Sequence, residues 1–289
     1  MPATDRGRRL RNALLTGKRR PRLFGSGSPS GLRGDGYEFA ELRAYVAGDD
    51  PRRIDWAATA RSGALQTRVV LEDVALTMAA IVDTSASMRV GRSTSLLDCA
   101  LDVLRAWFEA VESEDRAMQI TARGAVPDIR LRGRAAATAA FAFHASASEQ
   151  FDLWNHLRIA RAILPAGSAL LLITDGYDFT EEETVPDGDA MLADLGRRYD
   201  MTCLVARDPW YEGLPLRGFV RFKDAQSGRL LDAYIGARQR RAYVEAVARR
   251  EARLIERLEQ ARWRAAPLLE GAGPASLYAA FGVGHLVQS

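Results

Sequence analysis

The chain has 289 residues, of which 47% are hydrophobic and 27% are charged, a composition typical of soluble globular proteins. The 40 basic and 37 acidic residues give a formal net charge of +3, and this balance gives no reason to expect nucleic acid as a partner. No stretch approaches the roughly 18–20 consecutive apolar residues of a membrane span, and Cys99 and Cys203 lie in apolar patterns that favour reduced core thiols over a disulfide. We therefore expect a reducing, cytoplasmic compartment.

Residues 1–33 are expected to form a basic arm and a flexible loop. Eight arginine and lysine residues lie between Arg6 and Arg22, and the segment lacks the apolar core of a secretory signal. The pattern fits a solvated tail or helix, or an electrostatic tether to an acidic partner or to a membrane surface. Peripheral association with a membrane is therefore part of the expected localisation.

Residues 34–75 are expected to form a small β-rich extension. The stretch at 66–71 is rich in β-branched residues, which favours a strand. Its charged and aromatic residues can form a salt-bridge cluster that attaches the extension to the rest of the chain, with Trp56 packed over the main domain. The alternative is a partner-binding surface. The residues concerned are Arg43, Asp49, Asp50, Arg53, Asp55, Trp56 and Arg61.

From residue 76 onward, short apolar strands alternate with amphipathic helices. Strands are expected at 76–82, 117–122, 129–132, 168–174 and 201–205, and helices at 96–111, 135–143, 152–164 and 189–199. This alternation predicts an α/β domain at 76–235, with an open, mostly parallel sheet covered by helices on both faces. Residues 236–289 are expected to add a helix and a tail, and that helix either packs along the domain or docks a partner.

The loop at 83–87, with the sequence DTSAS, directly follows an apolar strand. Asp83, Ser85 and Ser87 alternate, so a curved loop can turn their oxygens to one side. A later strand ends at Asp175, and parallel strands bring their carboxyl ends to one edge of a sheet. Carboxylates and hydroxyls form an oxygen-only site that suits Mg²⁺ or Mn²⁺ and that leaves room for an acidic ligand from a partner. The alternative is a serine-rich connection whose hydroxyls cap a helix.

These motifs resemble those of known families. The segments at 81–88 and 172–176 resemble the metal-ion-dependent adhesion site of von Willebrand factor A domains. Upstream segments resemble the signature of bacterial MoxR-associated proteins of domain-of-unknown-function family fifty-eight: Leu42-Arg43, Tyr45, Gly48-Asp49-Asp50, Arg53-Ile54-Asp55-Trp56 and Ala60-Arg61. The resemblance runs from about Gly34 to Arg207, and the short form with a basic start is similar to MxaS-type members. It implies a von Willebrand factor A–like, Rossmann-like fold.

The resemblance also implies a metal site. Its implied ligands are Asp83, Ser85, Ser87 and Asp175. The family pattern further expects a threonine ligand directly before the helix at 152, where this chain has Phe151, which offers no oxygen. Ser146, Ser148, Asp152 or water is left to take that place. We therefore expect Mg²⁺ or Mn²⁺ to be weakly held, exchangeable or absent.

The implied partners are a MoxR-type AAA+ ATPase, other von Willebrand factor A–like proteins and a client protein complex. We expect a non-enzymatic adaptor or co-chaperone for assembly, metal loading or activation of that client, with methanol dehydrogenase maturation as the implied process. The alternative is a metal-dependent hydrolase in which Asp83 and Asp175 activate a bound water. The chain lacks a G-x-S-x-G nucleophile motif, and none of its three histidines stands in an evident position to act as a base.

Overall fold

The computed structural model describes nine segments of the chain: 5–16, 37–46, 51–72, 75–112, 115–120, 129–132, 151–179, 187–223 and 229–283. The chain divides into two compact units. One comprises residues 12–75, and the other comprises residues 1–11 and 76–289. Within the described residues, no helix is both long and apolar enough to span a bilayer.

The smaller unit is built on an antiparallel strand pair. Its elements are β1 (Tyr37–Ala44), η1 (Pro51–Arg53), α2 (Trp56–Ser62) and β2 (Gln66–Glu72). The Asp55 side chain accepts a hydrogen bond from the backbone N–H of Ala58 at 2.9 Å and so caps the start of α2. Gly63 ends the helix in the left-handed region, at φ 71°, where a residue without a Cβ is favoured.

The larger unit contains a six-stranded sheet. Its strands are β3 (Thr77–Val82), β4 (Arg116–Gln119), β5 (Ile129–Arg132), β6 (Ala169–Thr174), β7 (Asp200–Ala206) and β10 (Arg264–Leu268). Across the sheet they are ordered β10-β7-β6-β3-β4-β5, and only the edge strand β5 runs antiparallel to its neighbour. Counted along the chain this is the doubly wound order 3-2-1-4-5-6. The expected α/β fold with a mostly parallel sheet is therefore confirmed.

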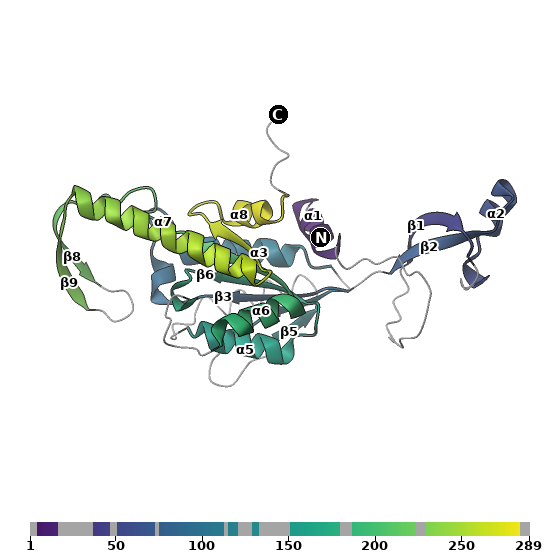
Figure 1. The fold of residues 1–289 in the computed structure, drawn as a ribbon, viewed down its shortest axis with the longest axis horizontal. Coiled ribbons are helices and arrows are strands. Elements are labelled where there is room, and N and C mark those ends of the chain that lie inside the picture. The colour runs from purple at the N-terminus through teal and green to yellow at the C-terminus, as the bar shows by residue number, and fades with distance from the viewer. Residues whose placement is uncertain are drawn as a thin grey trace, which may run out of the picture. The chain divides into compact units, whose positions relative to one another are not determined.

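Helices cover both faces of this sheet. They are α3 (Leu96–Glu109), α5 (Leu153–Ile163), α6 (Gly188–Arg198), α7 (Ala237–Gln260) and α8 (Gly273–Ala280). Ala79 and Ile81 of β3 belong to one buried cluster with apolar residues of α5, α6 and α7, and Figure 1 shows these three helices on the near side of the sheet. Successive strand residues point to opposite faces, so the equally buried Met78 and Ala80 face the other side, where α3 contacts β3.

The C-terminal segment belongs to the sheet unit. The sequence predicted residues 236–289 to form a helix and a tail outside the domain. The segment instead contains β10, which pairs with β7 in the sheet, and α8, which packs on α3. A further antiparallel pair, β8 (Gly218–Lys223) and β9 (Leu230–Ile235), was not predicted. The helix expected at 135–143 lies outside the described residues.

The N-terminal arm is partly structured. Residues Asp5–Thr16 form α1, and Arg11 is buried, with 8% of its surface exposed. Its guanidinium donates hydrogen bonds to both carboxylate oxygens of Asp115, at 2.8 and 3.0 Å. Arg11 therefore serves an internal ion pair and is not a solvated charge that could tether a partner.

Candidate functional site

The predicted site loops follow β3 and β6, the two strands at the centre of the sheet. The chain leaves β3 toward β4 on one side, and β6 begins the series that continues to β7 and β10 on the other. Crossover connections between parallel strands are right-handed. Because the chain winds in opposite directions from β3 and from β6, the connecting helices lie on opposite faces of the sheet and leave a crevice at the carboxyl ends of these two strands. Ligands of doubly wound sheets bind in such a crevice.

Asp83 joins the ends of the two strands. Its Oδ2 accepts a hydrogen bond from the Thr174 hydroxyl at 2.8 Å, and its Oδ1 accepts one from the backbone N–H of Ser85 at 2.8 Å. The backbone N–H of Asp83 donates to the carbonyl of Ile173 at 2.8 Å. Only 2% of Asp83 is exposed, so its carboxylate is fixed in position by neighbours on both strands.

The two serines of the loop lie together. Ser85 precedes the short helix η2 (Ala86–Arg89), and its hydroxyl lies 2.9 Å from that of Ser87. Both serines are half-buried. Neither hydroxyl caps the short helix, which disfavours the capping alternative for Ser85. The alternation in the sequence thus brings the two hydroxyl oxygens side by side.

Asp175 carries an unsatisfied buried oxygen. Its Oδ1 accepts a hydrogen bond from the backbone N–H of Tyr177 at 3.1 Å, whereas its Oδ2 is buried and has no hydrogen-bond partner among the described residues. A buried carboxylate oxygen without a donor costs free energy unless a cation or water binds it. Burial raises the pKa of Asp83, and the negative charge of Asp175 raises it further. The site therefore concentrates negative charge that a cation would neutralise.

The donor set fits a small divalent cation. Among the described residues there is no group of three or more histidine, cysteine or acidic side chains that could hold a metal. The site instead offers the carboxylates of Asp83 and Asp175 together with the hydroxyls of Ser85 and Ser87. Oxygen-only donors with few negative charges suit Mg²⁺ or Mn²⁺, which keep several waters when bound.

Phe151 has a packing role where the family pattern expects a threonine. Its ring stacks on His156, with ring centroids 4.6 Å apart. Of the three side chains considered as substitutes, Asp152 uses its Oδ1 to cap α5, by accepting a hydrogen bond from the backbone N–H of Asn155 at 2.9 Å. The other two, Ser146 and Ser148, lie outside the described residues.

The signature residues of the smaller unit divide into several local roles. Trp56 is 68% exposed, and the Asp55 side chain caps α2. The predicted packing of Trp56 over the main domain stays a prediction. Arg43 donates to the carbonyl of Ala44 at 3.0 Å, and Arg61 is exposed. Asp49, Asp50 and the side chain of Arg53 lie outside the described residues.

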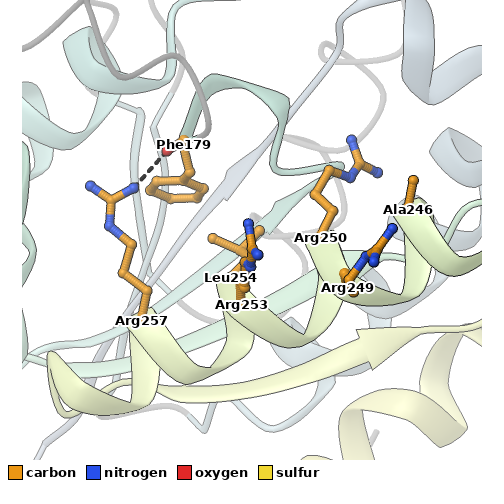
Figure 2. Close-up of a pocket in the computed structure, with 7 residues that line it drawn as sticks. All are labelled: Phe179, Ala246, Arg249, Arg250, Arg253, Leu254 and Arg257. Atoms are coloured by element: carbon orange, nitrogen blue, oxygen red, sulfur yellow. Dashed lines mark hydrogen bonds between the residues drawn. The ribbon is translucent and has the colours of Figure 1, made fainter.

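The sequence did not predict an arginine-rich pocket beside the second acidic loop. The pocket has a volume of about 460 Å³ and lies between α7 and the short helix η3 (Tyr177–Phe179), which begins two residues after Asp175. Its lining includes Phe179, Arg249, Arg250, Arg253, Leu254 and Arg257 (Figure 2). The four arginines occupy helical spacings on α7, and this pattern was the available signal in the sequence.

Comparison with known proteins places the chain in context. A family model described as "Protein of unknown function DUF58" matches residues 41–253. Uncharacterized proteins of Mycobacterium bovis and Mycobacterium tuberculosis are 43% identical to the chain over 60 residues. That match spans 21% of this chain and 19% of each relative, so it covers about a fifth of their length.

Three solved structures match part of the chain. An aerotolerance-related membrane protein from Bacteroides fragilis is 15% identical, covers 73% of this chain and all of its own, and has a TM-score of 0.44. The conserved hypothetical protein BatB from Bacteroides thetaiotaomicron is 15% identical, covers 72% of this chain and 97% of its own, with a TM-score of 0.43. A von Willebrand factor type A protein from Catenulispora acidiphila is 18% identical, covers 49% of this chain and 34% of its own, with a TM-score of 0.36.

Proposed function

The chain belongs to the DUF58 family of proteins of unknown function, and from this premise we propose that it is a non-enzymatic, von Willebrand factor A–like adaptor. It binds an acidic side chain of a partner through a divalent cation at the edge formed by Asp83, Ser85, Ser87 and Asp175. The observation that carries the proposal is the buried Oδ2 of Asp175, which has no hydrogen-bond donor among the described residues. A cation at this oxygen would remove the cost of burying an unpaired charge.

The residues of the two loops would bind such an ion in different ways. Asp175 offers its free Oδ2, and the adjacent hydroxyls of Ser85 and Ser87 offer neutral oxygens. Asp83 already accepts hydrogen bonds on both oxygens, so it holds the loop in shape and supplies charge through its remaining lone pairs. A bound Mg²⁺ or Mn²⁺ supplies an electrophilic centre that a carboxylate of another protein can join.

The wider system follows from the family resemblance and stands as part of the proposal. The partners are a MoxR-type AAA+ ATPase, other von Willebrand factor A–like proteins and a client complex that the ATPase assembles, activates or loads with metal. A relation to MxaS-type members makes methanol dehydrogenase maturation the client process, and the site of action is the cytoplasm. The adaptor role is preferred to hydrolysis because hydrolytic metal sites usually hold their ion with histidines or several carboxylates, and no group of three such ligands occurs among the described residues.

Calorimetric titration with Mg²⁺ and Mn²⁺ tests the metal site directly. Wild type is expected to bind at up to millimolar ion, and Asp83→Ala is expected to lose that binding. Asp102→Asn is the matched control, because Asp102 is an exposed acid on α3 that forms an ion pair with Arg105 at 2.9 Å. No heat for the wild type at millimolar ion would contradict the metal-bridged proposal.

Recovery of a MoxR-type ATPase on immobilised protein tests the partner. The proposal expects recovery in Mg²⁺ and a loss on addition of EDTA or with Asp83→Ala. Equal recovery under all three conditions would show that the interaction does not use the cation. Recovery that fails with Asp102→Asn as well would point to a general effect of charge.

A further inference from the structure

The arginine pocket on α7 lies beside the acidic loop that follows β6. We propose that it binds an extended acidic peptide segment of the partner, with alternate acidic side chains paired to Arg249, Arg253 and Arg257. The identity of the ligand as a partner's peptide rests on the proposed function, whereas the pocket's preference for acidic side chains does not need the metal.

The pocket carries uncompensated positive charge. Within the described ranges, the exposed side chains of Arg249 and Arg253 make no hydrogen bond and no ion pair. The buried Nη1 of Arg250 also has no hydrogen-bond partner there. Like charges four residues apart on a helix repel each other, so an anion between Arg249 and Arg253 would stabilise this face of α7.

The remaining contacts hold two of the arginines in place. Arg250 lies over the ring of Tyr177, with its guanidinium carbon 3.6 Å from the ring centroid. Arg257 donates to the carbonyl of Phe179 and to the carboxylate of Asp189, both at 2.6 Å. Figure 2 shows Arg257 and Arg250 projecting from α7 on either side of Leu254, with the Phe179 ring beside Arg257. These contacts hold Arg250 and Arg257 in place on the pocket wall, whereas Arg249 and Arg253 extend into solvent.

The pocket and the acidic loop share a wall. Gly176 directly follows Asp175, and a Cβ at Gly176 would collide with the side chain of Leu254, which lines the pocket. The next residue, Tyr177, stacks against Arg250. A partner segment that presents a carboxylate at the acidic loop therefore meets the arginine pocket within the next few residues.

The spacing and the lining favour a peptide over a small anion. Residues four apart on a helix lie about 6 Å apart along its axis. Alternate side chains of an extended chain lie about 6.6 Å apart on one side, so every second residue of an extended peptide matches Arg249, Arg253 and Arg257. Phe179 and Leu254 add apolar surface that suits side-chain methylene groups. The volume of about 460 Å³ is within the usual range of ligand pockets.

The test is fluorescence anisotropy with a labelled ten-residue peptide of alternating glutamate and alanine, with the full chain in EDTA. Wild type is expected to bind, and the variant Arg249→Gln/Arg253→Gln is expected to bind about tenfold more weakly because two ion pairs are lost. The matched control is Arg238→Gln/Arg241→Gln, two exposed arginines of the same helix outside the pocket lining, which should leave the affinity unchanged. Unfolding temperatures of all variants establish that each is folded.

Four outcomes would overturn the proposal. The first is no effect of the pocket substitutions, and the second is an equal loss in the control variant, which indicates non-specific attraction. The third is displacement of the peptide by inorganic pyrophosphate at concentrations below that of the unlabelled peptide, which indicates a phosphate site. The fourth concerns the glutamates at 181–183, which lie outside the described residues. If the peptide binds only after these glutamates are replaced by glutamine, the occupant of the pocket is this segment of the chain itself.

Addition of Mg²⁺ separates this proposal from the metal-bridged function. If the metal site and the arginine pocket both bind the peptide, Mg²⁺ raises the affinity of wild type for the peptide and leaves the affinity of Asp175→Asn unchanged. If Mg²⁺ has no effect while the arginine variant still loses affinity, the arginine pocket stands and the metal-bridged function fails.

Discussion

Replacing Asp175 by asparagine should change stability in opposite ways with and without metal. The asparagine carbonyl oxygen can still accept from the backbone N–H of Tyr177, so the bond at 3.1 Å is kept. The substitution removes a buried charge whose Oδ2 has no partner among the described residues, and it places an N–H₂ donor there instead. The replacement is neutral, so the variant no longer pays for an unpaired buried charge or for its repulsion of Asp83, and without metal it should be more stable than wild type by about 1 kcal/mol.

With metal bound, wild type should become as stable as Asp175→Asn or more stable. Mg²⁺ at about one hundred times its dissociation constant stabilises a binding protein by about 2.7 kcal/mol, a gain that only wild type should show. The assay is urea unfolding in EDTA and again in Mg²⁺, with Asp102→Asn as the control that follows wild type in both. An Asp175→Asn protein that is less stable than wild type in EDTA, or that is stabilised by Mg²⁺ as strongly as wild type, would refute the reasoning.

Three further predictions concern the scaffold around the site. Asp115→Ala removes the carboxylate that pairs with both sides of the buried Arg11 guanidinium and leaves it the longer pair with Glu112 at 3.3 Å, so it should lower the free energy of unfolding by about 3 kcal/mol in urea titrations. Arg9→Ala, which removes an exposed ion pair of the same helix, should change it by less than about 1 kcal/mol. Burial lowers the pKa of His156 below the ordinary histidine value of 6.5, so the unfolded chain takes up a proton at a higher pH than the folded protein does. The unfolding temperature should therefore fall as the pH drops below 6.5, and His156→Gln should weaken this dependence on pH. Gly176→Ala should destabilise by about 1–3 kcal/mol in the same titrations, because φ is +76° and its Cβ meets Leu254. Leu254→Ala should destabilise less in the Gly176→Ala background than in wild type, because it relieves the collision there; an equal cost in both backgrounds would contradict the collision.

The sequence predicted the central elements well because their signals are local. Buried parallel strands such as β3 and β6 appear as continuous apolar runs, and α3, α5 and α6 show helical periodicity. The missed strand β10 has the sequence RAAPL, without β-branched residues, and it contains Pro267. Proline is tolerated there because β10 lies at the sheet edge and pairs only with β7, a fact of topology that no local pattern carries.

The candidate site was predictable only in part, because its contacts depend on which strands and helices are neighbours. The order of strand, DTSAS loop and helix indicated that Asp83 stands at a strand end. The hydrogen bond from Thr174 to Asp83 joins residues 91 positions apart, and it depends on β3 and β6 being neighbours. The arginine pocket likewise required contact between α7 and the loop after β6.

The two proposed recognition sites differ in charge in a way that gives the cation a second role. Without metal, Asp83 and Asp175 present negative charge next to the positive pocket of α7, so an acidic partner is repelled by one part of the edge and attracted by the other. A bound divalent cation neutralises the two carboxylates, so that the positive charge of the α7 pocket is no longer opposed along this edge. Electrostatic complementarity acts mainly on the rate of association, which falls as salt rises. On the proposed function, Mg²⁺ should therefore raise the association rate of an acidic partner more at low salt than at high salt, in addition to the direct bond that the ion supplies.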